Sequence, residues 1–214
     1  MIRNIIWDLD GTLFDTYPAM AAAFRLALRD LGGDADLDWL EALARESVGH
    51  CISTMADTYG LSEDDVTQGF AEHYAHIEAE EQPPFSGVVE ICWYILRIGG
   101  QNCIVTHRGS ESTARLLAAH GMAGLFTACV TGGGGYPKKP DPAAMQAILS
   151  EHALLREETI AVGDRDIDIL AGRAAGLFTC RFGAESGAVK ADLRVDRFSE
   201  LYEFLVAATG STEA

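Results

Sequence analysis

The chain has 214 residues, of which 48% are hydrophobic and 22% are charged, a composition typical of a globular protein with one sizeable core or with a core that carries a smaller inserted domain. Its formal net charge of −16 disfavours nucleic acid and anionic membranes as partners, so a small anionic ligand would need a local cationic site. No apolar run approaches the roughly 20 residues that span a bilayer, and the N-terminal residues resemble neither a signal nor a transit peptide, so we expect a cytoplasmic protein without a membrane partner.

The five cysteines fit such a compartment, because they are odd in number, scattered and without a CxxC pair. They predict reduced, buried thiols and disfavour a disulfide framework or a zinc site. These residues are Cys51, Cys92, Cys103, Cys129 and Cys180. The sequence makes no prediction of the oligomeric state.

The first predicted element is a buried strand at Ile5–Trp7, which runs into two acids, Asp8 and Asp10, and then meets Gly11. In open α/β sheets, ligands gather beyond the carboxyl ends of the strands, so these acids are candidate site residues. Two carboxylates so close together in an apolar setting require a cation or a shared proton. A turn that merely ends the strand would use the same residue types, and this stretch alone does not separate the two interpretations.

Residues 16–83 predict helices only. Apolar residues recur at helical spacing from Pro18 to Leu31, from Leu37 to Ala44 and again after Ser62, which is a good N-cap residue. Pro83 and Pro84 then end the block. We therefore predict an all-helical cap domain at residues 16–83, inserted into a core made of residues 1–15 and 84–214. The cap follows the first strand directly and could act as a lid over its carboxyl end.

Within the cap, Val48, Gly49 and His50 are the first candidates for contacting the substrate, since segments over a rigid sheet vary with the ligand while the core chemistry is kept. The alternative interpretation of these residues is a helix C-terminus with Gly49 as its cap.

From Ser86 onward, helices alternate with short apolar strands, which favours an α/β fold with a parallel sheet and helices on both faces. Helices are predicted at residues 88–98, 110–120, 142–152, 167–175 and 198–208. Strands are predicted at residues 102–106, 127–131, 159–162, 178–181 and 193–195.

Polar residues follow the later strands as well. They are Thr106, Lys139 in the loop after the strand at 127–131, and the segment from Asp164 to Asp168. Each has a simpler interpretation, as a helix cap for Thr106 and Asp164 or as a solvated loop charge for Lys139. Because the carboxyl ends of parallel strands meet at one edge of the sheet, the set as a whole favours a functional site.

Phosphoryl transfer is the chemistry that would use these residues. Asp8 would attack phosphorus and form an aspartyl-phosphate, while Asp10 would donate a proton to the leaving oxygen and later remove one from water. Carboxylate and phosphate repel each other, and a Mg²⁺ ion bound by Asp8 and Asp164 would offset that repulsion.

The phosphate group would need further contacts. Lys139 would supply a second positive charge, and the hydroxyl of Thr106 would bind a phosphate oxygen. Backbone N–H groups at the turns would bind the remaining oxygens, and Gly11 and Thr12 are the candidates at the first turn.

These residues resemble the four ordered motifs of the haloacid dehalogenase-like hydrolase superfamily. The motifs are Asp8-Leu9-Asp10-Gly11-Thr12, Thr106, Lys139-Pro140-Asp141-Pro142 and Gly163-Asp164-Arg165-Asp166-Ile167-Asp168. The resemblance implies a Rossmann-like core, an inserted helical cap and Mg²⁺ dependence. It implies that Asp8 is the nucleophile and that Asp10 is the acid/base and gives the metal a backbone carbonyl. It further implies that Asp164 is the metal aspartate and that Asp168 supports the metal waters or the lysine.

The stretch from Ile167 to Gly176 and the position of the cap look most like the phosphoglycolate phosphatase-like branch of that superfamily. Dehalogenation is disfavoured, because dehalogenating members lack an acid at the position of Asp10. His107 follows Thr106 where many relatives carry asparagine, and it would either contact substrate or pair with a cap carboxylate.

We therefore expect a Mg²⁺-dependent phosphatase, a phosphoric monoester hydrolase that acts on a small phosphorylated metabolite. A sugar-phosphate mutase of the β-phosphoglucomutase type would use the same core residues but return the phosphoryl group to a second hydroxyl. A catalytically silent binding module that kept the fold is a third possibility, although it would have no need of both Asp8 and Asp10.

Overall fold

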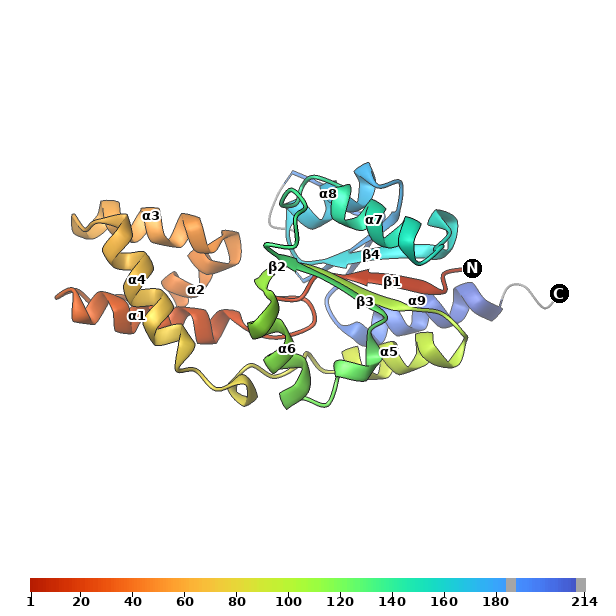
Figure 1. The fold of residues 1–214 in the computed structure, drawn as a ribbon, viewed down its shortest axis with the longest axis horizontal. Coiled ribbons are helices and arrows are strands. Elements are labelled where there is room, and N and C mark those ends of the chain that lie inside the picture. The colour runs from red at the N-terminus through yellow and green to blue at the C-terminus, as the bar shows by residue number, and fades with distance from the viewer. Residues whose placement is uncertain (184–187, 211–214) are drawn as a thin grey trace. The chain divides into compact units, whose positions relative to one another are not determined.

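The computed structural model describes residues 1–183 and 188–210, and in this part of the chain six parallel strands form one sheet (Figure 1). The strand order is β3-β2-β1-β4-β5-β6, which places β1 between β2 and β4. The α/β class and the parallel sheet predicted from the sequence are confirmed. The strands are β1 Asn4–Trp7, β2 Asn102–Gly109, β3 Ala128–Gly132, β4 Thr159–Gly163, β5 Phe178–Phe182 and β6 Leu193–Val195.

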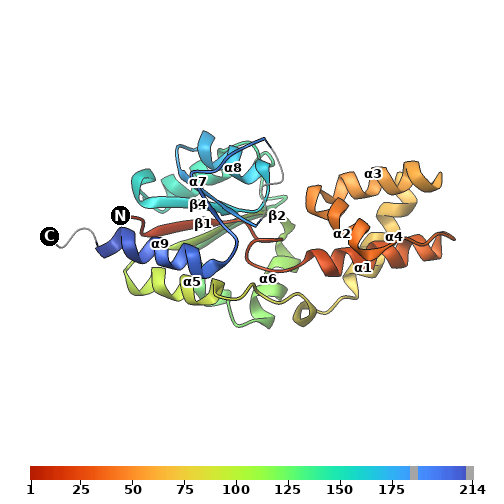
Figure 2. The same cartoon turned by 180° about the vertical axis from the view of Figure 1, so that it is seen from behind.

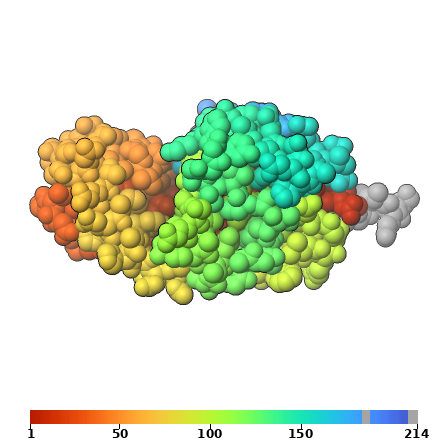
Figure 3. Space-filling model, in the orientation of Figure 1, coloured from red at the N-terminus to blue at the C-terminus, as the bar shows by residue number. Residues whose placement is uncertain are grey.

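Helices cover both faces of this sheet. Figures 1 and 2 show α7 and α8 on one face and α5, α6 and α9 on the other. Strands β1 and β4 are buried along their whole length. On the face drawn in Figure 3, little of the red N-terminal colour is visible between later segments. The helices are α5 Val88–Arg97, α6 Ser110–Ala119, α7 Ala143–Glu151, α8 Asp166–Ala174 and α9 Phe198–Gly210, with short 3-10 turns at Ala123–Leu125 and Arg156–Glu158. A further 3-10 turn, Ala79–Glu81, belongs to the inserted segment.

Side chains of β1 alternate between the two layers, as expected for a strand. Ile6 belongs to the core cluster that includes Met145 of α7 and Ala171 of α8. Trp7 belongs to the opposite layer, where its ring lies 5.9 Å from that of Phe198, measured between centroids. Because a shift by one residue would exchange the two sets of side chains, this alternation fixes the register of β1 against its neighbours. The residue after Trp7 therefore has a defined position at the edge of the sheet.

Strands β1 and β4 end within one residue of each other, and the neighbouring β2 runs on to Gly109. Trp7 pairs with Ile104 of β2 and with Val162 of β4. Since the strands are parallel, the segments that follow these residues emerge at the same edge of the sheet. This is the edge at which the predicted acids stand.

The chain divides into two compact units, one made of Met1–Phe14 and Pro84–Ala214 and the other of Asp15–Pro83. The second unit consists of helices α1 Tyr17–Asp30, α2 Leu37–Glu46, α3 Val48–Tyr59 and α4 Glu63–Ala75. Their apolar faces share one core, in which the rings of Phe24 and Phe70 stack with centroids 4.0 Å apart. This unit therefore has a hydrophobic core of its own.

Helix α3 differs from the expectation drawn from the sequence. Gly49 is not a helix C-cap, because it lies in the first turn of α3. The break between α2 and α3 is the single residue Ser47, whose backbone is extended and whose hydroxyl accepts a hydrogen bond from the N–H of His50 (2.9 Å). A serine N-cap can start a new helix at once, so no glycine is required at this boundary.

The segments that enter and leave the inserted unit lie side by side in space. Phe14 and Pro84 form an isolated antiparallel bridge. On the core side, the N–H of Phe85 donates to the carbonyl of Leu13 (3.0 Å), and on the other side the N–H of Asp15 donates to the carbonyl of Pro83 (2.9 Å). The entering and leaving segments are thus joined by backbone hydrogen bonds.

All five cysteines are free thiols, and four of them are buried as predicted. The prediction is wrong for Cys129, which is exposed on β3. No helix in the described residues combines the length and the apolar character that a membrane span requires.

Candidate active site

Strand ends bring the predicted residues together. Asp8 follows β1 directly, and β4 holds it in place because the N–H of Asp8 donates to the carbonyl of Val162 (2.8 Å). Asp164 follows β4, and Thr106 lies in the last half of β2. Lys139 comes from the loop between β3 and α7, and its Nζ lies 2.5 Å from Oδ1 of Asp8.

Lys139 is buried between two carboxylates. Its Nζ contacts Oδ1 of Asp8 (2.5 Å) and Oδ1 of Asp168 (2.6 Å), and it donates to the carbonyl of Val105 (2.9 Å). Burial alone would lower the pKa of Lys139, but the charges of Asp168 and Asp8 outweigh burial and raise it. Lys139 is therefore a buried, charged ion-pair partner, and its interpretation as a solvated loop charge is wrong.

Asp8 experiences opposing influences. Burial is the largest and raises its pKa, the charge of Lys139 lowers it, and the carboxylates of Asp168 and Asp164 raise it again. The result is a pKa of about 7, against an ordinary value of 3.8. Because burial disfavours the ionised carboxylate, additional positive charge next to Asp8 would favour its ionised form, which is the form a nucleophile requires.

The acids at this edge could hold a divalent cation. One carboxylate oxygen each from Asp8, Asp164 and Asp168 lie within 4.8 Å of one another. Oδ2 of Asp8 is buried and has no hydrogen-bond partner among the described residues, whereas Asp168 already accepts from the N–H of Arg165 (3.1 Å) and pairs with Lys139. Asp8 and Asp164 thus fit a hard, oxygen-seeking cation such as Mg²⁺, and Asp168 fits a supporting role.

The turn after Asp10 is tight. Gly11 has a φ of +78°, a region that favours glycine, and its N–H donates to the carbonyl of Phe14 (2.8 Å). Thr12 is completely buried, and its hydroxyl donates to Oδ1 of Asp164 (3.2 Å). In this structure Gly11 closes the turn and Thr12 orients Asp164, and contacts of either residue with a phosphate stay predictions.

Thr106 and His107 lie where the pairing of β2 with β3 shifts register, between Val105 and Gly109. The hydroxyl of Thr106 accepts a hydrogen bond from the N–H of Arg108 (3.1 Å). Nε2 of His107 accepts one from the backbone N–H of Lys139 (2.9 Å). This contact fixes the start of the lysine side chain, a role that neither of the two interpretations of His107 from the sequence included.

The contacts of His107 also settle its charge. Burial lowers its pKa most, and the positive charges of Lys139 and Arg165 lower it further, to about 4. The ring is therefore neutral near pH 7, and with Nε2 as the acceptor its proton lies on Nδ1.

Sequence reasoning missed two arginines. Nη1 of Arg108 lies 2.5 Å from Oδ1 of Asp10, in a pair whose side chains are 7% and 18% exposed. Arg181, at the end of β5, is fully buried; its Nη1 donates to the carbonyl of Asp164 (2.9 Å) and its Nη2 pairs with Asp166. Both arginines lie at the carboxyl ends of strands, and this position could have marked them as candidate site residues in the sequence.

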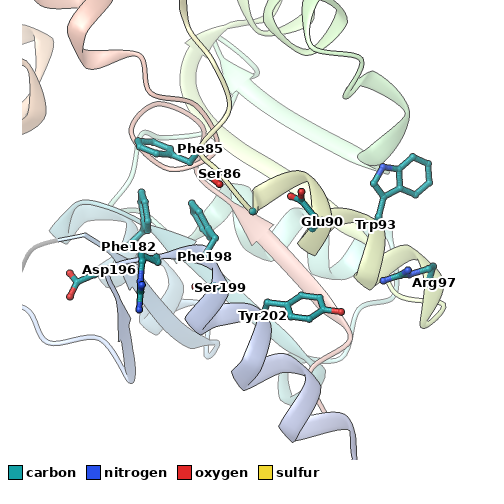
Figure 4. Close-up of a pocket in the computed structure, with 12 residues that line it drawn as sticks. Phe85, Ser86, Glu90, Trp93, Arg97, Phe182, Asp196, Phe198, Ser199 and Tyr202 are labelled. Carbon is teal, nitrogen blue, oxygen red and sulfur yellow. The ribbon is translucent and has the colours of Figure 1, made fainter.

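A cavity of about 810 Å³ lies elsewhere in the core unit, between α5 and the first half of α9 (Figure 4). Its walls include the aromatic rings of Phe85, Phe182 and Phe198, which contact one another, together with Trp93 and Tyr202. None of the predicted site residues lines it. The predicted site residues therefore lie at the strand ends and not in this cavity.

Comparison with known proteins agrees with the geometry. Residues 5–182 match the model of the family described as haloacid dehalogenase-like hydrolase. A phosphoglycolate phosphatase from Vibrio parahaemolyticus is 31% identical over 223 residues, which cover 97% of each chain. The crystal structure of a hydrolase from Streptococcus pneumoniae is 29% identical and superposes with a TM-score of 0.67 over 96% of this chain and 98% of that one. A crystal structure from Haemophilus somnus, described as a predicted phosphoglycolate phosphatase, is 21% identical with a TM-score of 0.81 over 95% of this chain and 98% of that one, a likeness of fold.

Proposed function

Since this chain belongs to the haloacid dehalogenase-like hydrolase family and is a phosphatase, we propose that it hydrolyses a small phosphorylated metabolite through an aspartyl-phosphate on Asp8, in a Mg²⁺-dependent reaction. The observation that carries the proposal is the environment of Asp8, a buried carboxylate that pairs with Lys139 and has Asp164 beside it. 2-Phosphoglycolate is the first substrate to examine, because the relatives of similar length are phosphoglycolate phosphatases.

The reaction would proceed in two displacements. Asp8 attacks phosphorus, the bond from phosphorus to the leaving oxygen breaks, and Asp10 donates a proton to that oxygen. Asp10 then removes a proton from a water molecule, which attacks phosphorus and displaces the carboxylate of Asp8, so that inorganic phosphate is released. The two acids are two residues apart, yet their side chains have different cationic partners, Lys139 and Arg108.

The other residues would hold the phosphate and the ionised nucleophile. Lys139 keeps positive charge beside Asp8 while Asp168 and the backbone carbonyl of Val105 keep the ammonium in place. The hydroxyl of Thr106 would bind a phosphate oxygen. A Mg²⁺ ion held by Asp8 and Asp164 would, when bound, reduce the repulsion between carboxylate and phosphate.

We further propose that the helical unit of residues 15–83 is the cap of this enzyme and contributes to the choice of substrate. The reduced state of all five cysteines supports a cytoplasmic location.

Release of free phosphate from a panel of phosphorylated metabolites, 2-phosphoglycolate included, tests the proposal. We expect turnover in Mg²⁺, none after chelation by EDTA, and recovery when Mg²⁺ is restored. Full activity in chelator would contradict the metal role of Asp164.

The D8N variant should lose the nucleophile, so turnover of p-nitrophenyl phosphate within tenfold of the parent would contradict the role of Asp8. Conversion of glucose 1-phosphate to glucose 6-phosphate without free phosphate would instead identify a mutase.

A further inference from the structure

We propose that the chain forms a symmetric dimer through the exposed side of helix α5, with a second copy of the same chain as the partner. This side, the α5 face, consists of Glu90, Trp93 and Arg97, and Tyr202 of α9 borders it across the cavity of Figure 4. All four residues belong to the core unit, and none is a predicted site residue. The inference is therefore independent of the proposed function.

The α5 face is the solvent side of an otherwise buried helix. Glu90, Trp93 and Arg97 are its exposed residues, whereas its other residues are buried or half-buried. Their spacing of three and then four positions places them on one side of the helix, and Figure 4 shows them following one another along α5. This row of three side chains is thus the surface that α5 offers to a partner.

An exposed tryptophan stands at the centre of the α5 face. Trp93 is 54% exposed and lines the cavity together with Tyr202 and three phenylalanines. The ring centroids of Phe85 and Phe182 lie 4.8 Å apart, and those of Phe182 and Phe198 lie 4.2 Å apart. Apolar surface therefore continues from Trp93 into the aromatic wall of the cavity. Exposed patches of this kind mark interaction sites, and tryptophan is enriched at the centres of interfaces.

The charges on either side of Trp93 make the α5 face complementary to itself. Glu90 and Arg97 have opposite charges, and neither has an ion-pair partner among the residues that the structure describes. If two α5 helices pack antiparallel about a two-fold axis near Trp93, Glu90 of each copy lies opposite Arg97 of the other, and the two Trp93 side chains meet at the centre. A single surface thus supplies both halves of the interface.

A simpler interpretation explains the two charges but not the tryptophan. Glu90 in the first turn and Arg97 in the last turn suit the helix dipole, which gives no reason for an exposed tryptophan between them. The whole chain has a formal charge of −16, so two copies repel each other over most of their surfaces. Around the cavity, however, two acids, Glu90 and Asp196, are balanced by two arginines, Arg97 and Arg197. A second copy can therefore approach on this face without that repulsion.

The mass of the full chain in solution tests the inference. Analytical ultracentrifugation and light scattering over about 0.1–200 μM should give twice the mass of one chain, 23.0 kDa, at the upper end of this range. A wild-type protein with the mass of one chain at every concentration would overturn the inference. If that monomer binds an anilinonaphthalene sulfonate dye and W93S does not, the cavity accepts a small molecule in place of a second copy.

Charge reversal tests the antiparallel pairing. In E90R and in R97E, symmetry creates two contacts between like charges, so each variant should raise the dissociation constant of the dimer by about tenfold. The double variant E90R/R97E exchanges the charges and restores both pairs, so it should return to within about threefold of the wild-type value. W93S should remain monomeric. R115E is the matched control and should leave the constant unchanged, because Arg115 is an exposed arginine of helix α6 that does not line the cavity.

All these substitutions replace exposed residues, so circular dichroism and urea unfolding should show intact folds. A dimer that persists unchanged in W93S, E90R and R97E would place the interface on another face and overturn the inference. A double variant that dimerises as weakly as the single variants would show that Glu90 and Arg97 do not meet across the interface, and this result too would contradict the proposed dimer.

Discussion

Replacing Asp8 by asparagine should stabilise the metal-free protein while it removes the nucleophile. The carboxylate of Asp8 is 4% exposed and shares the ammonium of Lys139 with Asp168, at 2.5 and 2.6 Å. Two buried carboxylates thus depend on one cation, and asparagine keeps the shape of the side chain without the second negative charge. We expect the D8N variant to have a larger free energy of unfolding than the wild type.

The size of this gain follows from the pKa of Asp8, which burial and the neighbouring acids raise from 3.8 to about 7. Above pH 7 the group is ionised in both the folded and the unfolded state. The folded state then carries the full free-energy cost of a buried, ionised carboxylate, which is roughly 4 kcal/mol as an upper limit. Below about pH 4 the group is protonated in both states and the penalty vanishes. The wild type therefore becomes less stable, by up to this amount, as the pH rises from about 4 to about 7, and D8N does not.

Urea unfolding in EDTA at pH 5 and pH 8 measures the effect. The advantage of D8N should be larger at pH 8 by about 2 kcal/mol. D168N is the matched control with the opposite sign. Burial raises the pKa of Asp168, but the charges and hydrogen bonds of Lys139 and Arg165 together outweigh burial and lower it, so loss of this carboxylate should destabilise the protein at pH 8. A D8N variant that is less stable than the wild type at pH 8, or equally favoured at both pH values, would refute the reasoning.

Three further substitutions probe neighbouring contacts. Lys139→Met leaves two buried carboxylates without their cation, so it should lower the free energy of unfolding by about 3–5 kcal/mol at pH 8, and unchanged urea unfolding would contradict the ion triplet. Burial and nearby cations lower the pKa of His107 to about 4, so the wild type should lose stability as the pH falls from about 6.5 to about 4. Since the ring is partly exposed, the H107Q variant should remove only about 1 kcal/mol of that loss. Urea unfolding of both proteins at pH 7 and pH 5 measures the difference. Arg181→Lys should weaken Mg²⁺ binding about tenfold by loosening the backbone of Asp164, as read by isothermal titration calorimetry, whereas R194K, at an exposed arginine, should leave the affinity unchanged.

Most of the fold could be predicted because the sequence alternates between two clear periodicities. The buried runs of β1 and β4 and the helices between them follow from residue pattern alone. Helix α3 is not predicted, because Gly49 follows the preceding helical pattern and glycine usually ends helices. The structure breaks instead at Ser47, where one side-chain hydrogen bond starts the next helix.

The positions of the site residues could be predicted better than their partners. Asp8 and Asp164 converge because parallel strands end at one edge, which topology alone dictates, whereas Lys139 reaches them from the loop between β3 and α7. The pairing of Arg108 with Asp10 joins residues 98 positions apart and depends on the register shift in β2, which no local pattern reveals. The hydrogen bond from Lys139 to His107 likewise depends on how the loop after β3 folds back. The catalytic roles of these residues stay predictions until the variants are measured.

Because the segments that enter and leave the inserted unit are bridged to each other, this unit can be replaced as a whole. Phe14 and Pro84 already bridge each other, so a short turn between them would close the core chain without the intervening residues. A unit with its own hydrophobic core and adjacent ends can be lost, replaced or enlarged while β1 and the acids that follow it keep their positions. With the cap role proposed above, a new substrate preference would then require changes in this unit alone and none in the residues that follow β1.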